Sequence, residues 1–219
     1  MNPSTINPDE MLKSMAAQAV KQHEQIRTTI RDITLKALQM RDLSLEQING
    51  VVRNVTAGIN IGVGENKGDT QQTLSDAFAG MDDALLKVVE ANKLALQKLT
   101  DGGASFEESS VKKGLKELEA FEEKFLDGVK NAIQSSSDPI KQQWKSILDK
   151  IPRGGTETGA QVMETLNERA REAQAAVRSS REAGLKAMHT ITQNYATLVS
   201  GVLIGLSEAF EQTKTGTKR

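Results

Sequence analysis

The sequence predicts an all-α protein, an elongated helical bundle of about six helices with a long C-terminal helix. Apolar residues recur every three or four positions over most of the chain, which is the repeat of an amphipathic helix. The four prolines lie close to the start of the chain or at residues 139 and 152, so two long stretches contain no proline. We expect residues 9–213 to form a single helical domain, with 1–8 and 214–219 as flexible ends.

The first predicted helix begins near Asp9 and continues without interruption to Met40. Each step along its apolar face is three or four residues, as one continuous helix requires. The residues on that face are Leu12, Ala16, Ala19, His23, Ile26, Ile30, Ile33, Ala37 and Met40.

The second predicted helix starts at Ser44, because Ser44 and Gln47 have the spacing of a capping box. Its apolar face carries Leu45, Ile48, Val52, Val55 and Ile59. The alternation of Ile59, Ile61 and Val63 also fits a short strand. We favour a helix because no second strand lies nearby to pair with it.

Asp69 and Gln72 have cap spacing and open the third predicted helix, which the glycines at 102–103 end. Ser105 and Glu108 open the fourth. The inward residues are Leu74, Phe78, Met81, Leu85, Val88, Ala95 and Leu99 in the third helix, and Val111, Leu115, Leu118, Phe125, Val129 and Ile133 in the fourth.

The remaining helices are a short one and the longest one. An N-cap at Asp138 and a proline at 139 predict a short helix that carries Trp144 and ends near Pro152. From 156 to 213 the apolar residues recur about every 3.6 positions, so a straight helix would reach roughly 87 Å. Arg181 and Gly184 interrupt that stripe, and whether the helix continues through them stays open.

Composition excludes several classes of function. Lys and Arg total 28 against 29 Asp and Glu, for a net charge of -1, so we expect no nucleic-acid partner. The chain has no cysteine, which excludes a disulfide scaffold, a thiolate zinc site and a cysteine nucleophile. Charge is uneven, since residues 69–135 are acidic on balance. We expect a non-enzymatic protein without a cofactor.

The two histidines do not form a recognisable metal motif. A di-iron helix needs Glu three residues before each histidine, but Val20 and Lys186 stand before His23 and His189. His23-Glu24 is followed by Arg27 instead of the second histidine of a zincin helix. We therefore predict no metal site.

A glycine-rich turn before the last helix has the glycine spacing of a phosphate-binding loop but lacks its Lys-Ser/Thr pair. The free N–H groups of the helix N-terminus form a possible anion site with Arg153, Gly155, Thr156 and Thr158. An ordinary glycine-rich turn is the alternative.

Four carboxylates, Glu117, Glu119, Glu122 and Glu123, crowd the fourth predicted helix. Catalytic pairs need side chains that converge in a desolvated pocket, and the sequence does not show such convergence. The interleaved Lys113, Lys116 and Lys124 indicate a salt-bridged surface instead.

Two glycine pairs with four-residue spacing would let another helix approach closely. The second pair lies in a segment, 198–206, that is apolar nearly all round and therefore needs to be covered. Packing inside the bundle is the alternative to an external partner. The candidate interaction residues are Leu198, Val199, Gly201, Val202, Leu203, Gly205, Leu206, Gly58 and Gly62.

Several strings, at residues 33–38, 84–87, 155–159, 161–162 and 200–206, resemble an uncharacterised family of all-helical bacterial proteins, classed as a domain of unknown function. This resemblance covers almost the whole chain and implies a bacterial origin and no established activity. A looser likeness is to phasins, which coat polyhydroxyalkanoate granules. It depends on cysteine-free, aromatic-poor amphipathic helices.

We predict a structural or interaction protein that self-associates, or coats an apolar surface in phasin-like fashion, through residues 198–206. Its partner would be a second copy, another protein, or a granule or membrane surface. The alternatives are a helical adapter that binds a protein through its acidic middle helices, and a membrane-active, pore-type protein. The N-terminus does not resemble a secretory signal, and the longest apolar run has eleven residues, so we expect a cytoplasmic protein.

Overall fold

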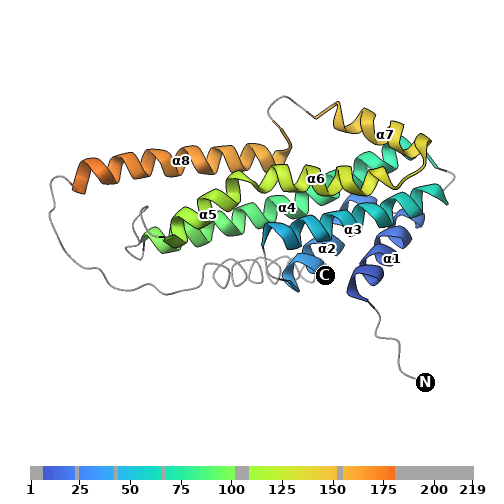
Figure 1. Cartoon of the computed structure of the whole chain (residues 1–219), viewed down its shortest axis with the longest axis horizontal. Helices are drawn as coiled ribbons and strands as arrows, with labels where there is room; N and C mark the ends of the chain where they lie inside the picture. The colour runs from blue at the N-terminus through green and yellow to red at the C-terminus, as the bar shows by residue number, and fades with distance from the viewer. Residues whose placement is uncertain are drawn as a thin grey trace, which may run out of the picture.

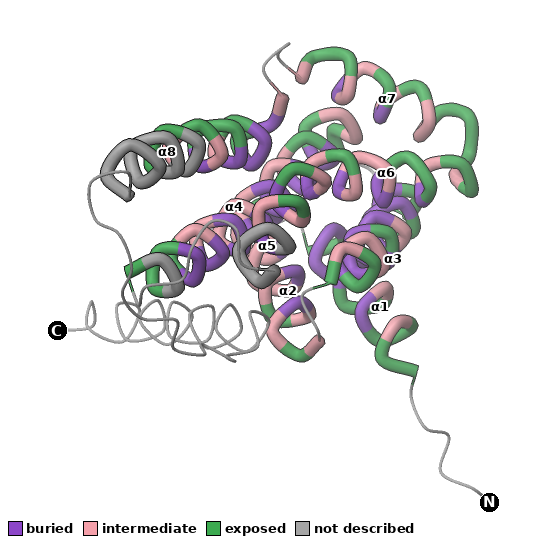
Figure 2. Tube along the Cα trace, turned by 60° about the vertical axis from the view of Figure 1, so that its left-hand side comes forward, coloured by how far each residue is buried: buried purple, intermediate pink, exposed green. Residues whose placement is uncertain are grey.

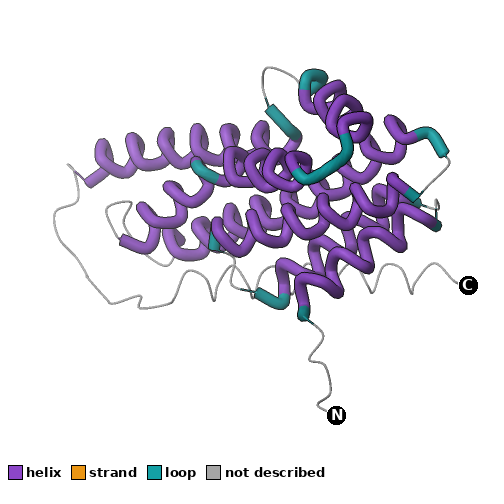
Figure 3. Tube along the Cα trace, turned by 45° about the vertical axis from the view of Figure 1, so that its right-hand side comes forward, coloured by secondary structure: helices purple, strands orange, loops and turns teal. Residues whose placement is uncertain are grey.

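The computed structural model describes residues 7–22, 25–41, 44–65, 68–101, 109–151 and 155–180. These residues form eight α-helices and no strand, as Figures 1 and 3 show. The helices are α1 (Pro8–Lys21), α2 (Ile26–Gln39), α3 (Leu45–Gly64), α4 (Thr70–Asp101), α5 (Ser109–Glu119), α6 (Phe121–Gln134), α7 (Asp138–Leu148) and α8 (Glu157–Ser180). The all-α class is confirmed.

Side-chain caps explain where several helices begin. Ser44 Oγ accepts the Gln47 N–H at 3.4 Å, so the predicted start of α3 is confirmed. Asp69 Oδ1 accepts the N–H groups of Gln71 and Gln72 and caps α4. At α1 the side chain of Asn7 accepts a backbone N–H, and the helix therefore begins at Pro8, inside the predicted flexible end.

The prediction of a single helix from Asp9 to Met40 is wrong. Gln25 has φ 52°, a left-handed conformation that no continuous helix contains, and it separates α1 from α2. The two helices then pack on different neighbours, α1 on α3 and α2 on α4. The apolar residues predicted to lie on one helix thus belong to two helices, and their spacing of three or four residues continues from the first helix into the second. His23 lies outside the described residues.

The predicted fourth helix is also two helices, α5 and α6, with a turn at Ala120 between them. Leu118 and Phe121 lie on either side of this turn and are both buried. The described residues therefore hold eight helices and not about six. At α7 the cap is Ser137, one residue earlier than predicted.

The stretch around residues 59–63, for which a strand was an alternative, lies within α3 and is helical. The predicted long C-terminal helix is described only as far as Ser180. Its extension toward 213 and its possible break at Gly184 lie outside the described residues.

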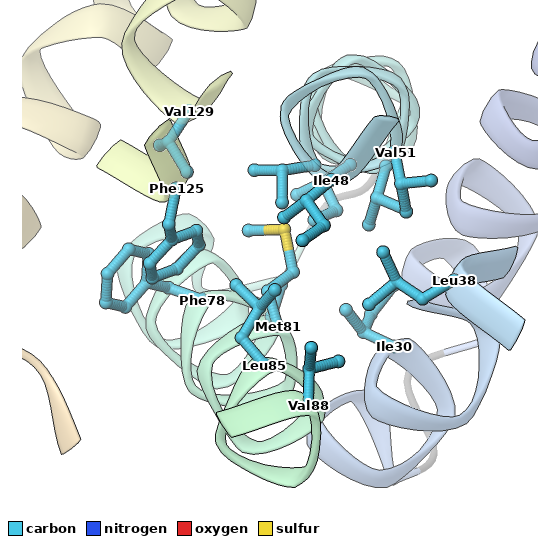
Figure 4. Close-up of a cluster of buried hydrophobic side chains, with 14 of the residues drawn as sticks. Ile30, Leu38, Ile48, Val51, Phe78, Met81, Leu85, Val88, Phe125 and Val129 are labelled. Atoms are coloured by element: carbon cyan, nitrogen blue, oxygen red, sulfur yellow. The ribbon is translucent and has the colours of Figure 1, made fainter. Parts of the chain in front are cut away.

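The core is centred on α3 and α4, which are the most buried helices in Figure 2. Helix α3 packs against α1, α2, α4 and α6, while α4 also contacts α2, α7 and α8. Figure 4 shows the centre of this core, where Met81 and Leu85 of α4 face Ile48 of α3 and Ile30 of α2. Phe78 stacks on Phe125 with the ring centres 5.3 Å apart.

Helix α7 is joined to this core by the tryptophan of the chain. The ring of Trp144 is fully buried and meets Phe78 edge-on, with ring centres 6.4 Å apart. Its Nε1–H donates to Asn60 Oδ1 at 2.7 Å, and Asn60 Nδ2 donates to the Ala132 carbonyl at 3.3 Å. One buried asparagine of α3 therefore links α6 and α7.

Candidate functional site

The structure places the predicted interaction residues in two different situations. Residues 198–206 and Arg153 lie outside the described part of the chain. Gly58 and Gly62 are buried in α3, directly beneath α1.

The contact between α1 and α3 depends on these two glycines. A Cβ at Gly62 would lie 2.6 Å from the Ala17 carbonyl oxygen and 2.7 Å from the Val20 Cβ. At Gly58 a Cβ would lie 2.8 Å from the Ala16 Cβ. All three distances are shorter than side chains tolerate, so glycine is required at both positions for this close approach. The helix that Gly58 and Gly62 receive is α1 of the same chain.

The turn at residues 155–159, for which the sequence predicts a possible anion site, holds two carboxylates of the chain itself. Thr156 donates its N–H and its hydroxyl to Glu122 Oε1 of α6, at 2.7 and 3.1 Å. The N–H groups of Glu157 and Thr158 donate to the two oxygens of Asp82 in α4, at 3.0 and 3.3 Å. We call Asp82 and Glu122 the carboxylate clamp.

Two glycines make room for the clamp. A Cβ at Gly159 would overlap the Glu122 carboxylate, and a Cβ at Gly155 would approach Glu122 Oε2 to 2.8 Å. Gly155 also has φ 88°, which side chains rarely adopt. Gly159, the second glycine of the spacing that resembles a phosphate loop, thus helps to seat a glutamate, while the first, at 154, lies outside the described residues.

The electrostatics of the clamp combine favourable and unfavourable contributions. Negative charge is stabilised at a helix N-terminus, where N–H groups point outward. Asp82 is nevertheless only 7% exposed. This burial raises the pKa of Asp82 above its usual value, while the hydrogen bonds from Thr158 and Glu157 act in the opposite direction.

Sequence reasoning did not find either carboxylate of the clamp. Glu122 was assigned to a salt-bridged surface, but it is half-buried and accepts two hydrogen bonds from Thr156. Asp82 directly follows Met81, a predicted core residue, and this position was the available signal for a buried acid. The partners lie 34 and 75 residues away along the chain, beyond any local motif.

A second feature is an open groove of about 430 Å³ between the N-terminal part of α4 and the C-terminal end of α7. Its apolar lining is Phe78, Ala79, Ile147 and Ile151, and its polar lining is Asp69, Gln71, Gln72, Ser75 and Lys150.

Large apolar side chains are also exposed on the described surface. The most exposed is Met40, and the others are Met11, Met15, Ile61, Leu94 and Met163. Met11 and Met15 are four residues apart on α1 and so share one helix face.

Among the described residues, no cluster of three or more His, Asp or Glu side chains could hold a metal ion. Within the same ranges, every helix is too short or too polar to cross a membrane.

Fold and site together define an all-helical protein whose eighth described helix is fixed by internal carboxylates. Residues 2–212 match a family model described as "Family of unknown function (DUF6781)". The chain belongs to this family, which agrees with the predicted resemblance to an uncharacterised helical family. No curated protein and no solved structure matches the chain.

Proposed function

We propose that the protein is a non-enzymatic, cytoplasmic interaction protein. Its helical body would present residues 198–206 to a second copy or to an apolar particle, which they would cover in phasin-like fashion. The observation that carries this proposal is the composition of that segment, which is apolar nearly all round and contains Gly201 and Gly205 at close-packing spacing.

The described body supports the proposal indirectly. Its first glycine pair, Gly58 and Gly62, is occupied by α1, which shows how this chain uses such a spacing to seat a helix. Burial of apolar surface yields about 25 cal/mol per Å². A few side chains of 198–206 would therefore contribute several kcal/mol to association, enough for a stable contact.

Flotation with liposomes or polyester granules, together with light scattering for solution mass, tests the proposal. We expect the wild type to float or to self-associate, and Leu203→Glu to abolish both. Leu94→Glu is the matched control because Leu94 is an exposed leucine of the body, 40% accessible. A wild-type protein that remains monomeric and ignores both surfaces would refute the proposal.

A specific observation favours a second candidate, a helical adapter. The lining of the groove between α4 and α7 combines apolar side chains, among them Phe78 and Ile147, with charged ones, Asp69 and Lys150. Such a site suits an apolar side chain of a partner protein. Ser75→Tyr would fill the groove. An adapter would lose its partner in this variant and keep it in Leu203→Glu, whereas the first proposal predicts the opposite.

A further inference from the structure

The described side chains of α8 bury little apolar surface against the rest of the molecule. Between residues 155 and 168, where its side chains are described, Val162 is the one large apolar side chain that is buried. Leu166 is partly buried. The other buried side chains on this face are polar, namely Thr156, Thr158 and Thr165. Since each buried aliphatic side chain stabilises by about 1.5–3 kcal/mol, apolar contact alone holds α8 weakly.

Hydrogen bonds at the start of α8 add to the docking of its described part. Thr158 donates its hydroxyl to the Asp82 carbonyl at 3.0 Å, in addition to the four bonds that the clamp carboxylates accept. Further along, Lys93 and Glu168 form an ion pair at 2.8 Å. Both members of that pair are partly exposed, so the pair adds little. Between residues 155 and 168, the hydrogen bonds that dock α8 are therefore concentrated at its first turn.

A glycine leads directly into the first turn of α8. Gly155 has the positive φ noted above. Because glycine adopts left-handed conformations as readily as right-handed ones, the backbone can change direction at this residue.

The body keeps its core without α8. Apart from Val162, the buried hydrophobic cluster is built from side chains of α1 to α7 in the described residues. Trp144 is held by Asn60 and Phe78, which belong to α3 and α4.

We propose that α8 is a hinged arm, which detaches from α4, α5 and α6 as one unit while α1 to α7 stay folded. The carboxylate clamp of Asp82 and Glu122 sets how often the arm is released. This inference is independent of the proposed function, because it concerns a motion of the chain alone and is tested without a surface or a partner.

Native-state hydrogen exchange of the full chain tests the inference. We expect amides of residues 159–168 to exchange at least about tenfold faster than those in the centre of α3, because they open without global unfolding. Asp82→Asn replaces one acceptor oxygen by an amide that cannot accept the N–H of α8. This variant should accelerate exchange in α8 by about a further tenfold. Glu122→Gln removes the charge of the other clamp carboxylate and should also accelerate exchange in α8.

Glu123→Gln is the matched control, since Glu123 precedes Lys124 on the same helix, carries the same charge and is exposed. It should leave exchange in α8 unchanged. Fluorescence of Trp144 reports whether the body remains folded, and it should be the same in all three variants. If α8 and α3 exchange at one rate in the wild type, and the clamp variants accelerate both equally, α8 opens only by global unfolding and the inference is overturned.

Discussion

Helices α3 and α8 are fixed to the same molecule by opposite means. The buried face of α3 is apolar and close-packed, with Val51, Val52, Val55 and Ile59 all fully buried. Over residues 155–168, where its side chains are described, the buried face of α8 is mostly threonine, and carboxylates hold its first turn. Apolar packing extends along a whole helix, whereas a capped N-terminus secures only one end. The comparison predicts a rigid α3 and a separable α8.

The largest expected effect is at the contact between α3 and α1. In Gly62→Val the new side chain would meet the Ala17 carbonyl and the Val20 side chain, and backbone atoms cannot move aside cheaply. We expect a loss of about 3 kcal/mol in the free energy of unfolding, measured by urea denaturation. Gly50→Ala is the control on the same helix, because a Cβ there meets no atom within 4 Å. That variant should be neutral or more stable by up to about 1 kcal/mol.

A smaller effect is expected where α3 holds α7. Asn60→Ala removes the acceptor of the Trp144 Nε1–H and leaves this buried donor unpaired. We expect a loss of about 2 kcal/mol by urea denaturation followed by circular dichroism. Adding Trp144→Phe removes the donor as well, so the double variant should cost less than the two single losses combined. Additive losses would show that the bond contributes nothing.

The clamp makes α8 sensitive to pH in a way that α3 is not, since the buried polar residues of α3, Asn54, Thr56 and Asn60, do not titrate. Burial raises the pKa of Asp82 above its usual 3.8, so the folded protein binds this proton more tightly than the unfolded chain. Between 3.8 and the raised pKa, the contribution of Asp82 to stability therefore grows as the pH falls.

Urea denaturation of the wild type and Asp82→Asn, from about pH 7 to about pH 4, measures this contribution. As the pH decreases, the free energy of unfolding of the wild type should increase relative to that of Asp82→Asn. Other carboxylates, such as Asp9, whose pKa is lowered mainly by its hydrogen bond to Arg41, are present in both proteins and cancel. If the wild type instead loses stability relative to Asp82→Asn as the pH decreases, the hydrogen bonds to Asp82 affect its pKa more than its burial does.

Features that depend on residues close together in the chain could be predicted from the sequence. Helix starts at Ser44 and Asp69 were predictable, because a cap depends on residues two or three positions apart. The apolar period also predicted four buried residues of α3, namely Ile48, Val52, Val55 and Ile59.

Two features could not be predicted, because they depend on which helices become neighbours. The apolar spacing continues across the break between α1 and α2, and periodicity does not record that the two halves face different helices. The clamp joins Asp82 and Glu122 to a turn far along the chain, and each is an ordinary acidic residue in its own helix. Only the tertiary fold brings them together.

The smallest effect is expected from a substitution that makes the buried face of α8 more apolar, as that of α3 is. Thr165 is fully buried, and its hydroxyl donates to the Gln161 carbonyl within α8 at 2.8 Å, so it contributes no hydrogen bond to the body. Thr165→Val keeps the shape and adds an apolar methyl group, worth about 0.8 kcal/mol when buried. Hydrogen exchange in α8 should slow by about threefold, with α3 unchanged.

Thr34→Val in α2 is the matched control. Thr34 is likewise fully buried, and its hydroxyl donates to the Ile30 carbonyl of its own helix at 2.7 Å. Because α2 belongs to the body, this change should alter the free energy of global unfolding and leave the faster exchange of α8 as it is. If both valine variants change exchange in α3 and α8 alike, the two helices share one opening, and their different modes of attachment have no dynamic consequence.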